Sequence, residues 1–155
     1  MKTEKGGMQM KVRKIWIAVL CVVIGVVWWV LRPQSLVHVA GVADKAEQIT
    51  RYSISAVDDD VEQCWVTEAE DMQEIWKALE TSKATFVPKS SKSVTYDGDQ
   101  VMYHLRIYED EKPVAELGFL DDGRVLGDTW EYRYQGENPA AWTQMLKGLL
   151  EKYTN

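Results

Sequence analysis

The run IWIAVLCVVIGVVWWVL occupies residues 15–31 and contains no charged side chain. A helix of this length spans about 25 Å, which is near the lower limit for crossing the hydrocarbon core of a bilayer. Trp28 and Trp29 suit the interfacial belt in which aromatic side chains concentrate, and Arg32 can extend to the lipid headgroups. The run therefore predicts a transmembrane helix over residues 15–31.

The charges on the two sides of this run differ in sign. Residues 1–14 carry five basic side chains and one acidic side chain, whereas residues 33–155 carry 12 basic and 23 acidic ones. Positive charge beside an apolar run keeps that end in the cytoplasm. We therefore expect a basic cytoplasmic tail over 1–14, a juxtamembrane tether over 32–45 and an extracellular domain over 46–155. This arrangement is that of a single-pass protein of the cell membrane.

Three other interpretations of the apolar run are less favoured than the anchor. A cleaved signal peptide needs small residues close behind its apolar region, but Arg32 and Pro33 follow here. Lipidation at Cys21 is disfavoured because Leu20 precedes it, where a small residue is needed. A buried core helix is disfavoured because no polar side chain gives the run a second face. The anchor is favoured, and cleavage stays open as the alternative.

Beyond residue 46 the hydrophobic pattern changes to that of strands and amphipathic helices. Residues 48–55 alternate and end at the acidic turn 58–60, and residues 62–66 follow as a hairpin partner. Thr67 and Glu70 match a capping box, which predicts a helix that ends near Ser82. The apolar stripe of this helix has the spacing of one helix face and consists of Met72, Ile75, Trp76 and Leu79.

The second half of the domain reads mainly as strands. Residues 83–93 are polar and contain Pro88, which predicts a surface loop. Strand candidates follow at 94–96, 100–108, 114–120, 124–126 and 130–134, separated by turns rich in Asp and Gly. A last helix is expected from Asn138 and Pro139 to about Lys152. Its apolar stripe consists of Trp142, Met145, Leu146 and Leu149.

The order of these elements is β-β-α-β-β-β-β-α, which predicts the α+β class. Each strand offers one apolar face and each helix one stripe, so the simplest closure is a two-layer domain. In it, two helices pack on one face of an antiparallel sheet. Trp130, Tyr132 and Tyr134 share one face of the last strand. They belong to the core if that face meets the helices, which we favour, and form an exposed ledge for peptide or glycan if it does not.

The outer part resembles the small extracytoplasmic domains of unassigned function in membrane proteins and lipoproteins of Gram-positive (Firmicute) bacteria, the YhfM-like group. The resemblance is a pattern of apolar spacings over most of residues 46–152, without a catalytic signature. It implies a fold and an envelope location, and no activity. Many such domains carry a lipid where this chain has an apolar run. The segments that carry the resemblance are AEQI at 46–49, EDMQEIWKAL at 70–79, residues 102–108 with LGF at 117–119, and WEYRY at 130–134 with residues 142–150.

Residues with catalytic chemistry are few. His38 lies in the expected tether, and His104 lies on the polar face of a strand, where a solvated face residue or a hydrogen-bonded spacer is expected. Cys64 is expected to be a small buried side chain with no disulfide partner, because Cys21 lies in the apolar run. The chain lacks the common nucleotide, zinc-protease and nucleophile-elbow motifs. We therefore predict no catalytic residue, no cofactor-binding residue and no metal ligand.

Acidic clusters are the best candidates for a cation site. They occur at 58–60, at Asp97 and Asp99, at 109–111, and at Asp121 and Asp122. Each falls at a hairpin turn, where Asp and Gly are favoured for backbone reasons, and none has the spacing of an EF-hand. Solvated turns are the expectation. The alternative is a calcium-dependent or enzymatic envelope protein that uses Asp97, Asp99 and Asp121.

The function expected from these features is a binding one. The net charge of −11 over residues 33–155 disfavours nucleic acid, because phosphate contacts provide most non-specific affinity. We expect a non-enzymatic, membrane-tethered binding or accessory module of the cell envelope, with an envelope protein, a peptide or a glycan as its partner. A sensor is a third class, although a 14-residue tail leaves little room for an intracellular partner.

Overall fold

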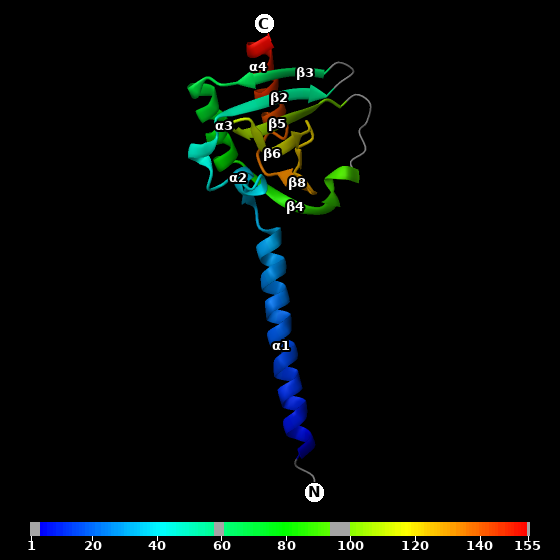
Figure 1. Ribbon diagram of the computed structural model, residues 1–155. Coiled ribbons are helices and arrows are strands. Elements are labelled where there is room, and N and C mark those ends of the chain that lie inside the picture. The colour runs from blue at the N-terminus through cyan, green and yellow to red at the C-terminus, as the bar shows by residue number, and fades with distance from the viewer. Residues whose placement is uncertain (1–3, 58–60, 94–99, 155) are drawn as a thin grey trace. The chain divides into compact units, whose positions relative to one another are not determined.

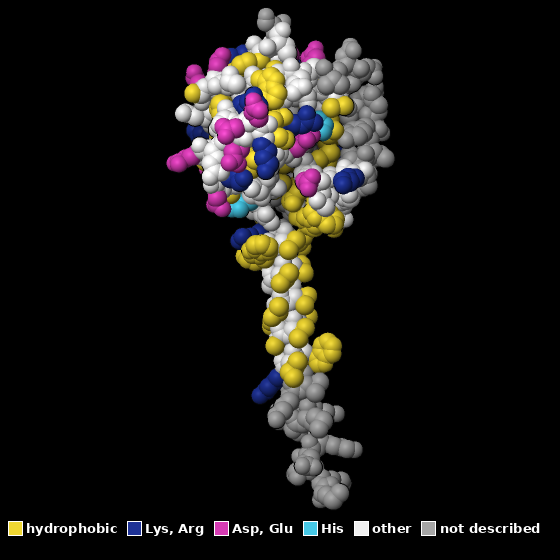
Figure 2. Space-filling view, in the orientation of Figure 1, with side chains coloured by type: hydrophobic (Ala, Val, Ile, Leu, Met, Phe, Trp, Pro, Cys, Tyr) yellow, Lys and Arg dark blue, Asp and Glu magenta, His cyan; other side chains and the backbone are white. Residues whose placement is uncertain are grey.

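The computed structural model describes residues 4–57, 61–93 and 100–154 and divides the chain into two compact units, Met1–Arg32 and Pro33–Asn155. Figure 1 shows the helices and strands of both. Helix α1 (Glu4–Leu31) runs without a break through the apolar run. Its segment Arg13–Leu31 has a mean hydropathy of 2.4 and is long and apolar enough to cross a membrane, a property that signal sequences share. In Figure 2 the visible side chains of this segment are mostly hydrophobic.

The second unit contains one eight-stranded antiparallel sheet, in the order β1-β4-β8-β7-β6-β5-β2-β3, together with short and long helices. This confirms the predicted α+β class. The strands are β1 (Gln34–Ser35), β2 (Arg51–Val57), β3 (Val61–Val66), β4 (Lys83–Ser90), β5 (Met102–Glu109), β6 (Lys112–Phe119), β7 (Arg124–Leu126) and β8 (Trp130–Tyr134). The helices are α2 (Leu36–Val39), the 3₁₀ helix η1 (Ala46–Gln48), α3 (Ala69–Thr81), the 3₁₀ helix η2 (Ser91–Ser93) and α4 (Ala141–Thr154).

The alternation in β5 sets the apolar face of the sheet. Leu105 pairs with Leu117 of β6 and with Ile54 of β2, and all three side chains are fully buried. His104 and Arg106 point to the opposite face, because successive side chains of a strand alternate. The predicted division of this strand into an apolar and a polar face is therefore confirmed.

Helices α3 and α4 contribute their stripes to the same buried cluster as this apolar face. Ile75 and Leu79 of α3 and Leu146 of α4 are fully buried in it. Trp142 of α4 is 4 % exposed, and its ring stacks on Phe119 of β6 with ring centres 4.7 Å apart. Burial of each such large apolar side chain stabilises the fold by about 1.5–3 kcal/mol.

The segment expected to be a tether belongs largely to the folded unit. Leu36, Val37 and Val42 are buried in the main core, and the backbone amide of Leu36 donates to the carbonyl of Ser82. β1 pairs with the start of β4. The expected boundary at residue 46 is therefore wrong, and the compact unit starts at Pro33. A two-residue strand and a four-residue helix are too short to produce a readable hydrophobic period.

The surface loop expected at 83–93 is wrong as well, because residues 83–90 form β4 and residues 91–93 form η2. β4 pairs with β8, with Ala84 opposite Tyr134 and Phe86 opposite Tyr132. The register shifts between Val87 and Ser90, and Pro88 lies inside this irregularity. Proline lacks a backbone donor and is tolerated in strands at bulges and edges, so its presence did not exclude a strand.

Three element ends also differ from expectation. The strand expected at 48–55 is β2, which starts only at Arg51, and Gln48 belongs to η1 instead. The N-cap of α3 is Glu68, without a side-chain cap, so the capping box at Thr67 is wrong. Asn138 does accept a hydrogen bond from the Ala140 amide, but α4 begins at Ala141. The expected strand at 94–96 and the expected turns at 58–60 and 97–99 lie outside the described residues.

Candidate functional site: a groove beside α3

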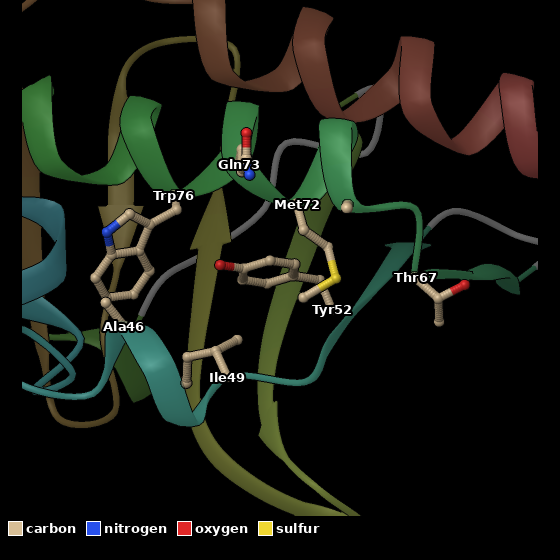
Figure 3. A pocket seen from close by; sticks show the side chains of 8 residues that line it. Ala46, Ile49, Tyr52, Thr67, Met72, Gln73 and Trp76 are labelled. Atoms are coloured by element: carbon tan, nitrogen blue, oxygen red, sulfur yellow. The ribbon is translucent and has the colours of Figure 1, made fainter.

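The apolar stripe of α3 is divided between the core and a groove. Ile75 and Leu79 are fully buried, whereas Met72 and Trp76 are only partly buried. The groove has a volume of about 350 Å³ and opens between α3 on one side and η1 with the start of β2 on the other (Figure 3). It is lined by Ala46, Ile49, Tyr52, Thr67, Ala69, Met72, Gln73 and Trp76.

Tyr52, a buried residue, brings a hydroxyl group to this groove. It lies in β2 between Val66 of β3 and Ile107 of β5, and the residue is 1 % exposed. Figure 3 shows its hydroxyl pointing toward the indole of Trp76. Burial raises the pKa of Tyr52, so the hydroxyl stays protonated and can donate to a ligand in the groove that it lines.

The other polar groups of the groove are neutral and lie at its rim. Thr67 and Gln73 are exposed, and within the described chain their side chains make no hydrogen bond. Ile49 and Met72 add apolar surface on opposite sides. Methionine has three rotatable bonds and a polarisable sulfur, so it adapts to ligands of different shape. The groove thus combines an apolar hollow with three neutral hydrogen-bonding side chains.

A charged cluster fixes α3 against α4 on another side of the helix. The Asp71 carboxylate accepts hydrogen bonds from the Lys152 ammonium at 2.6 Å and from the Tyr153 hydroxyl at 2.5 Å. Lys152 and then Tyr153 hold the pKa of Asp71 below its usual value. Burial and this carboxylate together raise the pKa of Tyr153 to about 12. The contact positions the helix that carries Met72 and Trp76.

A second, smaller hollow of about 230 Å³ lies over the polar face of β5 and β6. His104 Nδ1 is 2.7 Å from Glu116 Oε1, and Arg106 binds the same carboxylate at 3.0 and 3.4 Å. Burial opposes ionisation of Glu116, but Arg106 and His104 outweigh it and lower the pKa of this carboxyl. Ser91, which also lines the hollow, donates to the Asp128 carbonyl. The described lining of the hollow therefore contains a histidine in contact with a carboxylate and no assembled nucleophile–base pair.

Sequence reasoning missed this partner of His104. Of the two expected roles, His104 has the partnered one, with Nδ1 2.7 Å from Glu116 Oε1. Arg106 pairs directly with Glu116 and His104 pairs with Gly118, so the carboxylate two residues along β6 lies diagonally across from His104. Only the strand register could have revealed this contact.

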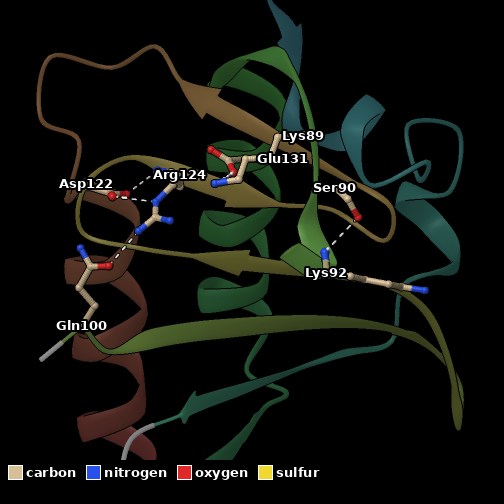
Figure 4. A network of polar contacts seen from close by, with 7 residues as sticks. All are labelled: Lys89, Ser90, Lys92, Gln100, Asp122, Arg124 and Glu131. Atoms are coloured by element: carbon tan, nitrogen blue, oxygen red, sulfur yellow. Dashed lines mark hydrogen bonds and ion pairs between the residues drawn. The ribbon is translucent and has the colours of Figure 1, made fainter. Parts of the chain in front are cut away.

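Three acids of the described turns, Glu109, Asp121 and Asp122, contact donors of the same chain. Asp121 accepts a hydrogen bond from Thr143 of α4. Asp122 binds the Arg124 guanidinium at 2.7 Å, and Figure 4 shows Arg124 extending on to Gln100. Glu109 pairs with Lys45 at 3.3 Å. In the described part of the chain no group of three His, Cys, Asp or Glu residues is arranged to hold a metal ion. Asp97, Asp99 and residues 58–60 lie outside the described residues.

The aromatic face of β8 is divided between core and surface. Tyr132 and Tyr134 pack against the main core, whereas Trp130 is 44 % exposed and meets Phe86 edge to face. A separate exposed aromatic, Trp65, lies under the Arg51 guanidinium at 4.5 Å. The favoured core interpretation therefore holds for the two tyrosines and is wrong for Trp130.

Comparison with protein-family models, with curated proteins and with solved structures gave no match to this chain.

Proposed function

We propose that the protein is a membrane-anchored, non-enzymatic binding module that takes an apolar ligand in the groove beside α3. The observation that carries this proposal is the Tyr52 hydroxyl, which lines the groove from a residue that is 1 % exposed, beside the partly buried Met72 and Trp76. Small-molecule and peptide sites are typically concave, mostly apolar and furnished with a few polar groups. The groove has each of these properties.

The lining of the groove supports binding rather than catalysis. General acid–base chemistry needs a titratable group with a pKa near the working pH. The lining residues are apolar or neutral, and Tyr52, the titratable one, is held in its protonated form by burial. The groove can therefore desolvate a ligand and hydrogen-bond it, and it offers no group to exchange a proton at neutral pH.

The anchor and its orientation are part of the same proposal. Helix α1 includes a segment of 19 residues that is long and apolar enough to cross a membrane, and residues 1–14 carry five basic side chains and one acidic one. Under the positive-inside rule these charges favour a cytoplasmic N-terminus and a folded unit at the outer surface. In this proposal α3 and α4 both cover the apolar face of the sheet, which is supported by their shared buried cluster.

Thermal unfolding of the full-length protein in lipid nanodiscs, with and without indole, tests the binding proposal. Ala69→Leu places a larger side chain in the groove on a position compatible with a helix, and Lys77→Leu is the matched control on an exposed position of α3. Indole should raise the melting temperature of wild type and Lys77→Leu in a saturable manner, because a ligand that binds only the folded state stabilises it. It should not raise that of Ala69→Leu. An equal rise in all three proteins, or none in any, contradicts the proposal.

A further inference from the structure

We infer that the ligand of this groove is an extended peptide segment that inserts an apolar side chain and carries a basic residue beside it. This inference rests on the proposed function, since it names the ligand class of the same groove. Two features carry it: the kind of hydrogen-bonding groups around the hollow, and the charge of the surface next to it.

The polar groups of the groove match those of a peptide backbone. The Gln73 amide can donate and accept at the same time, as a peptide unit requires, and the Tyr52 hydroxyl can donate to a carbonyl oxygen. Thr67 adds a third neutral partner at the rim. A volume of about 350 Å³ accommodates one or two large side chains between Met72 and Trp76. The groups thus provide apolar burial for a side chain and neutral partners for the main chain beside it.

The surface around the groove favours a positively charged ligand. No charged residue lines the groove, and α3 carries four acidic residues and one lysine. Glu80 lies one turn beyond Trp76 on the same face of α3, because residues four apart share a helix face. Glu47 follows Ala46 on the opposite wall. With a net charge of −11 over residues 33–155, the field of the unit attracts cations and speeds their encounter.

A glycan fits this lining less well than a peptide. A sugar presents many hydroxyl groups, and each needs a partner when it loses water. The described lining offers three polar side chains, and the remainder is apolar and consists of Ala46, Ile49, Ala69, Met72 and Trp76. An aliphatic or aromatic peptide side chain loses no hydrogen bond on entering such a hollow.

Binding of defined peptides to the full-length protein in phosphatidylcholine nanodiscs tests the inference. One fluorescent hexapeptide has Leu-Phe at its centre and Lys at both ends, and its counterpart has Glu at both ends. Empty nanodiscs report any binding to lipid. We expect the lysine peptide to bind at least about tenfold more tightly than the glutamate peptide, with a difference that shrinks at higher salt because exposed charges are screened.

Three conservative variants assign this binding to the groove. Tyr52→Phe should weaken the binding of the lysine peptide about tenfold, since it removes the hydroxyl donor of the groove without removing the ring. Glu80→Gln should reduce the preference for lysine, whereas Glu74→Gln, on a face of α3 that does not line the groove, should leave it unchanged. Equal affinity for the two peptides, or equal effects of Glu80→Gln and Glu74→Gln, overturns the inference.

The result with indole separates this inference from the proposed function. If indole stabilises the protein but neither peptide binds, or if chitotetraose displaces indole where the peptides do not, the peptide assignment is wrong and the groove remains a binding site. If indole fails as well, the proposed function fails with it.

Discussion

The hydroxyl of Tyr153 in α4 donates a hydrogen bond of 2.5 Å to the carboxylate of Asp71 in α3, a residue 82 positions earlier in the chain. Asp71 is 7 % exposed, and Lys152 contacts the same carboxylate. Asp71 immediately precedes Met72, so this contact fixes the turn of α3 from which the groove wall begins. The stability of the two-helix contact and the shape of the groove are therefore linked.

The lowered pKa of Asp71 predicts a loss of stability in acid. A carboxyl whose pKa is lower in the folded than in the unfolded state stabilises the fold above its unfolded pKa, about 3.9. This contribution is lost as the pH falls through the folded pKa. Urea unfolding of the full-length protein at pH 7 and at pH 3 should show a larger fall in midpoint for wild type than for Asp71→Asn. Parallel falls in the two proteins would rule out this role.

Trp142 is expected to be a main stabilising residue of the second unit. It is almost fully buried, stacks on Phe119, and donates through Nε1 to the Ser82 hydroxyl at 3.0 Å. Trp142→Ala should lower the free energy of unfolding by about 3–5 kcal/mol. Trp142→Phe, which keeps a stacking ring and loses the donor, should cost less. Trp130→Ala is the exposed control, and chemical denaturation that gave it the same cost as Trp142→Ala would contradict this packing.

The outcome for α3 shows what the sequence could predict. The spacing of Met72, Ile75, Trp76 and Leu79 predicts that the helix has one apolar face. Periodicity alone does not show how much partner surface is available. Ile75 and Leu79 are fully buried in the main core, whereas Met72 and Trp76 line the groove opposite η1, which the sequence does not predict. The helical periodicity of the sequence therefore does not predict the groove.

The remaining differences come from contacts between residues far apart in the chain. β4 is a strand because Phe86 and Ala84 find partners in β8, more than forty residues later. His104 has a carboxylate partner because the register of β5 and β6 places Glu116 within reach. Burial of Leu36 and Val37 depends on β4 and α3 being nearby. Local sequence carries no signal for these pairings, since tertiary contacts override local propensity.

Calcium is expected to have no specific effect on stability. Asp121 and Asp122 already contact Thr143 and Arg124. Millimolar calcium should raise the melting temperature no more than sodium chloride of equal ionic strength, because diffuse screening does not saturate at one site. Asp121→Asn should lower the melting temperature equally in both salts. A saturable, calcium-specific rise that Asp121→Asn or Asp97→Asn abolished would instead indicate a metal site.

The proposed topology predicts the outcome of a protease experiment. Protease added to intact protoplasts should cut the folded unit, whereas the N-terminal tail should be protected until the membrane is lysed. The anchored fragment should stay in the membrane fraction at alkaline pH, because a transmembrane helix is not released by loss of charge contacts. Release of residues 44–155 into the medium would indicate cleavage instead.

The binding site itself is tested most directly by the indole N–H signals of the full-length protein during a titration with indole, observed by NMR in nanodiscs with unlabelled ligand. The Trp76 signal, assigned through Trp76→Phe, should shift and saturate, because Trp76 lines the groove. The signals of Trp65 and Trp130, which are 42 % and 44 % exposed at other places on the unit, should stay unchanged. Shifts at Trp65 and Trp130 that equal those at Trp76, or a Trp76 signal that does not move, would contradict a ligand site beside α3.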